Sequence, residues 1–285
     1  MKLAQHEEYS QNNPQKKGKV EQDFFKGKMD PDLGVFCDLF SAQSTHKGQD
    51  GGVASTMLAA GLESGVFDTV VIVSRGEGYS AQVKVTHNAA EVLDSAGTVY
   101  LKANVTKKLR EMVMHGTKKI ALVCTPCEAK IARRIQQTLE GKCQITILGL
   151  FCYEAFDKDQ LKKSTEVQLG IDLDKAQKTQ VRKGKFSAFL DGKEFSCNLK
   201  DISSASEKSC HFCDDFTSRF ADLSVGSVGS KEGYSTVIVR SAAGENLVKL
   251  LVVEKKTADL EEIRRIAKFK KNRAKNNFAA LNVPK

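Results

Sequence analysis

Apolar runs of strand length alternate with helix-like segments between residues 50 and 170, and this alternation constrains the fold more than any other feature. The apolar runs are VVIV at 70–73, KKIALV at 118–123 and QITILGLF at 144–151. Helical patterns lie around them, at 50–65, 89–97, 105–116 and 128–139, and AQVKVT at 81–86 alternates like a further strand. Strands that alternate with helices are typical of α/β sheets with parallel strands. We therefore expect an α/β fold with a mixed, partly parallel sheet flanked by helices.

The pattern changes beyond residue 170. Residues 181–199 predict a β-hairpin that turns at Asp191 and Gly192. A cysteine-bearing loop region with the sequence SCHFCDD follows at 209–215, and the segment 243–271 is expected to form a helical C-terminal tail.

The N-terminal residues differ in character from this core. Residues 1–35 are polar, and Pro14 and Pro31 argue against a long regular element there. We expect three parts in the chain. They are a polar N-terminal extension at 1–35, a core at 36–241 and a basic helical segment at 242–285.

Composition limits the function classes. The 285 residues are 41% hydrophobic, which indicates a globular protein, and no run of about 18 apolar residues predicts a membrane span. The polar start lacks the apolar region of a secretory signal, so we expect a cytoplasmic protein. The net charge of +9 favours an anionic partner. The basic runs at 15–19 and 268–277 are interpreted as solvated faces or tails, and because no aromatic residues interleave with them, we expect no nucleic acid partner.

Eight cysteines are many for a cytoplasmic chain, where structural disulfides are rare, and they indicate metal ligation or redox chemistry. In CHFC at 210–213 a two-residue gap lets two sulfurs face one metal, which needs two more ligands. Cys127 and Cys152 each follow a predicted strand. If those strands are parallel neighbours, both cysteines emerge at one sheet edge, and four thiols can meet there: Cys127, Cys152, Cys210 and Cys213. His211 is a fifth candidate ligand.

Other interpretations of the cysteines stay open at this point. Cys127 and Cys152 are alternatively buried apolar residues, as free cysteines often are. The two cysteines of CTPC, Cys124 and Cys127, stand at a predicted helix N-terminus, which lowers the pKa of a thiol. The alternative to metal ligation is therefore a thiol–disulfide exchange site at this pair. The remaining three cysteines have no partner spacing and are predicted to be structural: Cys37, Cys143 and Cys197.

Two glycine-bearing turns are candidate ligand sites. QDGGVAST at 49–56 opens a helix with small residues, and free backbone N–H groups there favour an anion such as a phosphate. GSVGSKEGYST at 226–236 lets a backbone approach a ligand closely and offers hydroxyl donors. The alternatives are an ordinary helix start and a flexible loop. RKGKF at 182–186 adds three cations, and by itself is only a basic edge.

Taken in order, these pieces resemble one known family. The motifs are SAQST, DGGVAST, AGTVYLKANV, CTPC, LGLFC, KGKF, CHFC and ADLSVGSVGSKEGYSTVIVR. Together they resemble the beta subunit of coenzyme F420-reducing hydrogenase and its relatives, where F420 names a deazaflavin coenzyme. The resemblance runs from about residue 40 to residue 241. Each motif is weak by itself, whereas eight in this order are specific.

The resemblance implies an iron-sulfur flavoprotein. Family members bind FAD and one 4Fe-4S cluster, move a hydride between the deazaflavin and FAD, and pass single electrons through the cluster. It implies that the cluster ligands are Cys127, Cys152, Cys210 and Cys213. The family usually has glycine where this chain has Cys124, so Cys124 either replaces a ligand or is a spectator.

The resemblance also implies a FAD site and no acid–base catalytic residue, because hydride transfer depends mostly on positioning. Lys185 is expected to face a flavin or coenzyme phosphate. The basic surface is expected to attract coenzyme F420, which bears a phosphate and a polyglutamate tail. The implied FAD-binding residues are Gly51, Gly52, Ser55, Thr98, Lys102, Asn104, Lys185, Gly226, Ser227, Val228, Gly229, Ser230, Tyr234, Ser235 and Thr236.

We therefore expect a cytoplasmic oxidoreductase subunit, of the kind used in archaeal methanogenesis, within a hetero-oligomer. Its redox partner is expected to be a hydrogenase, a heterodisulfide reductase or another dehydrogenase. Two alternatives belong to other classes. A zinc-stabilised basic binding protein would be colourless and hold no flavin, and a thiol–disulfide exchange protein would reduce insulin through Cys124 and Cys127.

Overall fold

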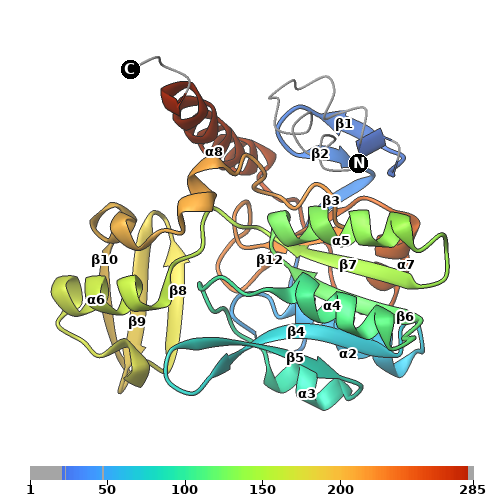
Figure 1. Ribbon diagram of the computed structural model, residues 1–285, viewed down its shortest axis with the longest axis horizontal. Coiled ribbons are helices and arrows are strands. Elements are labelled where there is room, and N and C mark those ends of the chain that lie inside the picture. The colour runs from blue at the N-terminus through green and yellow to red at the C-terminus, as the bar shows by residue number, and fades with distance from the viewer. Residues whose placement is uncertain (1–20, 23, 47, 282–285) are drawn as a thin grey trace.

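A seven-stranded sheet forms the centre of the molecule (Figure 1). The computed structural model describes residues 21–22, 24–46 and 48–281. The strands lie side by side in the order β3 (Asp38–Ala42), β12 (Ser235–Val239), β11 (Leu223–Gly226), β7 (Gln144–Leu150), β6 (Lys119–Cys124), β4 (Thr69–Gly76) and β5 (Ser80–Thr86). The four strands β11, β7, β6 and β4 are parallel to one another, whereas β3, β12 and β5 pair antiparallel with their neighbours. The predicted mixed, partly parallel sheet is confirmed.

Helices cover both faces of this sheet because successive strand residues point to opposite faces. In β4, Val70 and Ile72 join one buried cluster, while Val71 between them joins another. The first cluster takes in apolar residues of α2 (Val53–Glu63) and α7 (Ala242–Lys249). The second takes in those of α4 (Val105–Met114) and α5 (Pro126–Thr138), which cover the face toward the viewer in Figure 1. The short helix α3 (Ala89–Asp94) lies beside α2.

A second, three-stranded sheet lies beside the central one (Figure 1). It contains β8 (Lys178–Arg182), β9 (Lys185–Leu190) and β10 (Lys193–Asn198), and α6 (Lys158–Leu169) packs with it. Asp191 and Gly192 both have positive φ, 49° and 77°, as a two-residue hairpin turn requires, so the predicted hairpin is confirmed. The sheet has its own buried cluster around Phe156, Leu161 and Phe186. Three 3-10 helices complete this region: η2 (Leu173–Lys175), η3 (Leu199–Ala205) and η4 (Lys208–Phe212).

The C-terminal part is two helices rather than one continuous helical segment. Helix α7 ends at Lys249, and α8 (Leu260–Leu281) begins only after a nonhelical stretch at 250–259. In that stretch Lys256 pairs with Ser41 next to the central sheet. Asp259 then accepts a hydrogen bond from the Glu262 N–H at 3.0 Å and caps α8. The predicted helical C-terminal tail is confirmed in α7 and α8, whereas residues 250–259 are not helical because pairing with the sheet competes with helix formation there.

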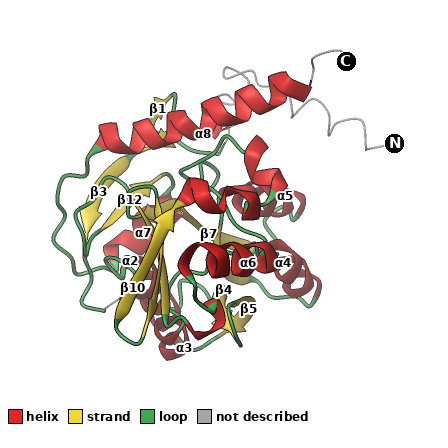
Figure 2. Cartoon of the chain, turned by 90° about the vertical axis from the view of Figure 1, so that its left-hand side faces the viewer, coloured by secondary structure: helices red, strands yellow, loops and turns green. Residues whose placement is uncertain are grey.

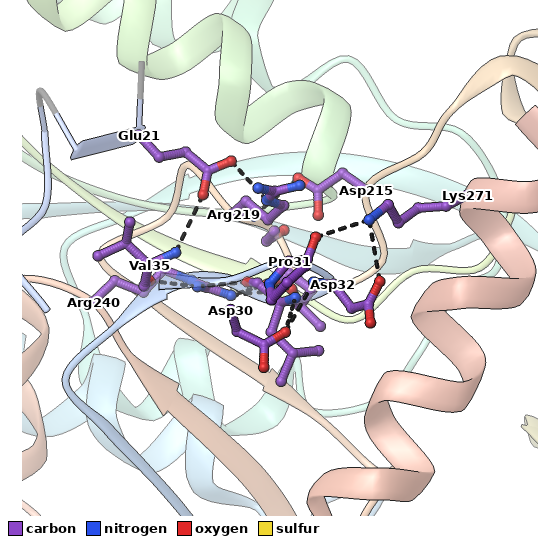
Figure 3. Close-up of polar contacts among 12 residues, drawn as sticks. Glu21, Asp30, Pro31, Asp32, Val35, Asp215, Arg219, Arg240 and Lys271 are labelled. Atoms are coloured by element: carbon purple, nitrogen blue, oxygen red, sulfur yellow. Dashed lines mark hydrogen bonds and ion pairs between the residues drawn. The ribbon is translucent and has the colours of Figure 1, made fainter. Parts of the chain in front are cut away.

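The described part of the N-terminal extension is integrated into the fold. β1 (Lys28–Asp30) and β2 (Gly34–Phe36) form a small antiparallel hairpin. Before this hairpin, Glu21 is buried and pairs with Arg219 at 2.6 Å (Figure 3). Residues 1–20, with Pro14 and the basic run at 15–19, lie outside the described residues.

Arg240 takes part in the polar contacts drawn in Figure 3. Its side chain is 0% exposed and donates hydrogen bonds to Leu33 O at 2.9 Å, to Val35 O at 2.7 Å and to Thr217 O at 3.0 Å. One side chain therefore joins the loop between the hairpin strands, β2 and the segment before β11. Together with the burial of Leu33 and Val35, these hydrogen bonds hold the N-terminal hairpin in place.

Helix α8 packs against the other side of the hairpin. Arg264 pairs with Asp30 at 2.7 Å, and Lys271 donates to Pro31 O at 2.8 Å and pairs with Asp32 at 3.1 Å. The predicted boundaries at 35/36 and 241/242 stay a prediction, but these contacts join the three parts. Among the described residues, no helix has the length and apolar character needed to cross a bilayer.

Candidate functional site

The carboxyl ends of the parallel strands form one edge of the central sheet, and two of the predicted cysteine ligands lie there. β6 and β7 pair in parallel, with Cys124 opposite Gly149. Cys127 follows in the first turn of α5, and Cys152 follows the end of β7. Because both strands point the same way, both cysteines emerge at the same edge, as the sequence predicts.

A third segment carries the CHFC cysteines to the same place. Cys210 lies in η4, and its sulfur accepts a hydrogen bond from the Ala155 N–H at 3.4 Å. The Cys152 N–H donates to Phe216 O at 2.9 Å, so the segments at 152–155 and 210–216 lie side by side. Burial raises the pKa of the Cys152 thiol to about 12, and the nearby thiols of Cys127, Cys210 and Cys213 act in the same direction. The structure therefore brings the four predicted cysteines together.

Among the residues described, no group of three or more histidine, cysteine, aspartate or glutamate side chains is arranged to hold a metal ion. His211 lies in the same turn as Cys210, and its backbone oxygen accepts a hydrogen bond from Asn277 at 2.9 Å. The structure thus shows four thiols in one neighbourhood, supplied by three separate segments.

Helix α8 forms a further wall of this cysteine site, which the sequence analysis missed. Figure 2 shows α8 as a long helix that crosses one end of the molecule. Lys270 is 1% exposed and donates to Cys152 O at 2.6 Å. Arg273 donates to Tyr153 O at 2.9 Å and to Cys210 O at 3.1 Å. The solvated interpretation of the run at 268–277 is therefore wrong for these residues. Lys270 and Arg273 are three residues apart, so they lie on one face of a helix, and this spacing was the sequence signal for a buried helix face.

The other cysteines have surroundings that suit structural roles. Cys124 is 3% exposed within the core between the sheet and α5, and burial raises the pKa of its thiol well above the ordinary value. This placement makes it a core residue rather than an exchange thiol. Cys143 is also buried, Cys197 packs against the core of the second sheet, and Cys37 donates to Val239 O at 3.3 Å.

The glycine turn before α2 lies at the same sheet edge. Gly52 has φ 69° and occupies the N-cap position, and the helix receives no side-chain cap. The Gly51 N–H donates to Ser235 Oγ at 3.1 Å, and a Cβ on Gly51 would lie 2.6 Å from Ala42 O. The two glycine turns therefore meet here. Ser55 stands in the uncapped first turn of α2, where N–H groups favour an anion.

The turn after β11 is built largely from its own contacts. Thr236 is buried, and its hydroxyl lies 2.6 Å from Ser230 Oγ and donates to Val228 O at 2.8 Å. The Gly229 N–H donates to Glu262 of α8 at 3.1 Å. These groups shape the turn from within. Gly226 and Ser227 open the turn, while Tyr234 and Ser235 lie at the start of β12, where the Tyr234 hydroxyl accepts from Lys256 at 2.8 Å.

Four predicted FAD residues lie outside the two glycine turns. Lys102 lies 3.4 Å from Ser209 Oγ, next to the cysteine loop, and Asn104 accepts a hydrogen bond from Lys107 N as the N-cap of α4. Thr98 lines a cavity between the two sheets. Lys185 is exposed at the start of β9.

A cavity of ≈ 730 Å³ lies between the two sheets. Gln49, at the start of the glycine turn, contacts the second sheet, because its side-chain amide donates to Thr179 O at 2.9 Å. The lining combines cations with carboxylates, and the sequence analysis had not singled out any of them. These residues are Arg75, Lys84, Lys178, Glu91 and Asp94. Such a mixed polar lining suits a ligand with both anionic and hydroxyl groups.

Known proteins match this chain over most of its length. The family of coenzyme F420 hydrogenase/dehydrogenase beta subunits matches with its N-terminal model at residues 39–110 and its C-terminal model at residues 117–265. The coenzyme F420 hydrogenase subunit beta of Methanococcus voltae is 34% identical over 231 residues, which are 77% of this chain and 82% of that protein. The protein of the same description from Methanothermobacter thermautotrophicus is 28% identical over 270 residues, which are 87% of this chain and 96% of that protein.

A solved structure agrees with the sequence relatives. A chain of the F420-reducing NiFe hydrogenase complex from Methanosarcina barkeri superposes with a TM-score of 0.83 at 28% identity, covering 89% of this chain and 94% of that chain. The matched residues 39–110 and 117–265 include the four cysteines and both glycine turns. By sequence and by fold, this chain belongs to the family of coenzyme F420 hydrogenase/dehydrogenase beta subunits.

Proposed function

We propose that this chain is a flavin- and iron-sulfur-containing electron-transfer subunit. In this proposal it oxidises or reduces coenzyme F420 by hydride transfer to or from FAD. Single electrons pass through a 4Fe-4S cluster to a partner subunit of a hetero-oligomer. The partner is a hydrogenase, a heterodisulfide reductase or another dehydrogenase, and the complex is cytoplasmic. The observation that carries the proposal is the meeting of four cysteines from three segments beside two glycine turns.

The cysteine site suits a cluster. Cys127, Cys152, Cys210 and Cys213 lie near one another. Four cysteine thiolates are the ligand set that holds a 4Fe-4S cluster. Lys270 brings a cation to the site, which suits an anionic centre.

The glycine turns suit a flavin nucleotide. Gly51, Gly52 and Ser55 present the uncapped start of α2, where a phosphate would be favoured. The nearby turn at 226–230 and Ser235 shape the adjoining surface. Lys102 lies beside the cysteine loop, 3.4 Å from Ser209 Oγ. We assign the cavity beside Thr98 to the remainder of the FAD or coenzyme site. Buried Thr236 contributes through the shape of the turn.

The chain's own residues position the reactants. Bound FAD would supply both hydride acceptance and single-electron release, which is why it suits a place between a deazaflavin and a cluster. Gly51 and Gly226 let the two turns pack tightly against the chain's own atoms, because an added Cβ would lie 2.6 Å from Ala42 O at Gly51 and would overlap the Phe151 side chain at Gly226. The net charge of +9 attracts an anionic coenzyme to the surface.

An anaerobic visible spectrum tests the proposed function. The purified protein is expected to show flavin bands over a broad cluster absorbance, and reduced coenzyme F420 should bleach both. Flavin and cluster that stay unbleached would show another hydride donor. A colourless protein with bound zinc, once cofactor loss in purification is excluded, would contradict the proposal.

Replacing Gly229 with valine is expected to lower FAD occupancy. Gly229 has φ 87°, and an added Cβ would lie 2.6 Å from the Ile263 side chain and 2.9 Å from Asp259 O, so the turn must move. The flavin-to-protein ratio after purification measures the effect.

A matched control separates this effect from backbone strain. Gly170, at the end of α6, has φ 65°, and a Cβ added there would meet nothing within 4 Å, so Gly170→Val imposes similar strain away from the site. It is expected to keep its flavin. Full occupancy in Gly229→Val would remove the turn from the FAD site.

A further inference from the structure

Lys270 is a buried lysine whose side chain ends among the cysteines. It is 1% exposed, and its Nζ donates to Cys152 O at 2.6 Å. The Cys213 thiol lies close enough to the ammonium to raise the pKa of Lys270. Lysine is almost never fully buried unless it is paired. A buried ammonium at this position therefore calls for negative charge nearby.

The groups that act on Lys270 are the thiols of Cys152 and Cys213 and the carboxylate of Asp215. Burial raises the pKa of both thiols, so they carry negative charge only as thiolate ligands. Asp215 also accepts a hydrogen bond from the Arg219 N–H at 2.9 Å. The neighbouring carboxylate of Glu154 is paired with Arg273 at 2.8 Å. Thiolate ligands around a cluster would give the ammonium the compensation that its burial requires.

Several contacts of α8 fix the position of Lys270. Arg273 donates to carbonyl oxygens of both cysteine segments, at Tyr153 and Cys210. Asn277 donates to His211 O at 2.9 Å. The rings of Phe212 and Phe278 pack with their centroids 5.0 Å apart. The helix is therefore attached to the loop along three turns, which places Lys270 beside the thiols.

We propose that Lys270 is a positioning residue that holds Cys152 and Cys213 and, through its fixed positive charge, raises the reduction potential of the cluster. The inference rests on the proposed function, since it requires the cluster at these cysteines. One-electron reduction adds one negative charge to the cluster. A nearby buried cation stabilises that charge, because hydrogen bonds, net charge and burial set the potentials of such centres.

Four variants of the full-length protein test this assignment. Lys270→Met removes the charge and the donor, Lys270→Gln keeps a donor without the charge, and Lys270→Arg keeps the charge. Lys275→Met removes an exposed lysine of the same helix, whose charge is screened by solvent. The readouts are iron content and the midpoint potential of the cluster, measured by an anaerobic titration followed by electron paramagnetic resonance.

The uncharged variants are expected to shift the reduction equilibrium of the cluster about tenfold toward the oxidised form, a lowering of about 59 mV for one electron. Lys270→Arg and Lys275→Met should stay close to the original protein. Loss of iron in Lys270→Met and Lys270→Gln, with iron kept in Lys270→Arg, also supports the role of the charge.

Two results would overturn the inference. One is an unchanged potential in both uncharged variants. The other is equal loss of iron or of fold in Lys270→Arg, which would assign Lys270 to helix packing alone. If the original protein itself holds no iron, the proposed function fails instead, so the two failures are distinguishable.

Discussion

Replacing Cys210 with serine is expected to remove most of the cluster iron. The sulfur of Cys210 accepts a hydrogen bond from Ala155 N, and the neighbouring carbonyl of Cys210 is held by Arg273. Serine keeps this local geometry but offers a hard hydroxyl in place of a soft thiolate. Because even outer-shell changes reduce metal affinity about 10–100-fold, loss of a ligand should cost at least as much. Iron per protein and the cluster absorbance measure the loss.

The matched control is Cys197→Ser. Cys197 is half-buried in β10 and packs against the core of the second sheet, away from the sheet edge that carries the other cysteines. We expect this variant to keep its iron. Unchanged iron in Cys210→Ser would remove Cys210 from the ligand set, and equal loss in both variants would indicate general damage to the fold.

Replacing Arg240 with methionine is expected to destabilise the protein by about 3–5 kcal/mol, the range for breaking a buried charged network. The change leaves Leu33 O, Val35 O and Thr217 O without their donor. It also leaves the buried carboxylate of Glu21 with one cation fewer nearby. Burial lowers the pKa of Arg240 to about 10, so the side chain stays charged at neutral pH.

Urea unfolding measures this second effect. The comparison uses unfolding midpoints of cofactor-loaded protein, since a bound cofactor breaks simple two-state behaviour. Arg110→Met, on the exposed side of α4, is the control and should change stability by less than about 0.5 kcal/mol. A midpoint for Arg240→Met equal to that of the control would show that water replaces these hydrogen bonds without cost.

The sequence predicted the central sheet because the relevant signals are local. Val70, Val71 and Ile72 are apolar on both sides, as a strand covered on two faces must be. The turns at Gly65 and Asp191 follow from the conformations that these residues permit. The convergence of Cys127 and Cys152 required only that two neighbouring strands be parallel, which the intervening helix implies.

The sequence pattern could not reveal which polar segments are buried. The run at 268–277 has the composition of a solvated face, yet Lys270 is enclosed because η4 and the segment after β7 pack against that helix face. Likewise, the N-terminal hairpin is buried because Leu33 packs against Phe216 and Ile263 and because Arg240, more than 200 positions away, supplies its hydrogen bonds.

By itself, then, the sequence determined the α/β sheet, the edge where the cysteines emerge and the order of motifs that marks the family. Periodicity and turn chemistry act over a few residues, so they can be read without the fold. Only the tertiary structure decided that α8 closes the cysteine site, that Cys124 belongs to the core and that Thr236 serves the turn from within. Burial and the pairing of charges depend on segments distant in sequence, and packing alone brings those segments together.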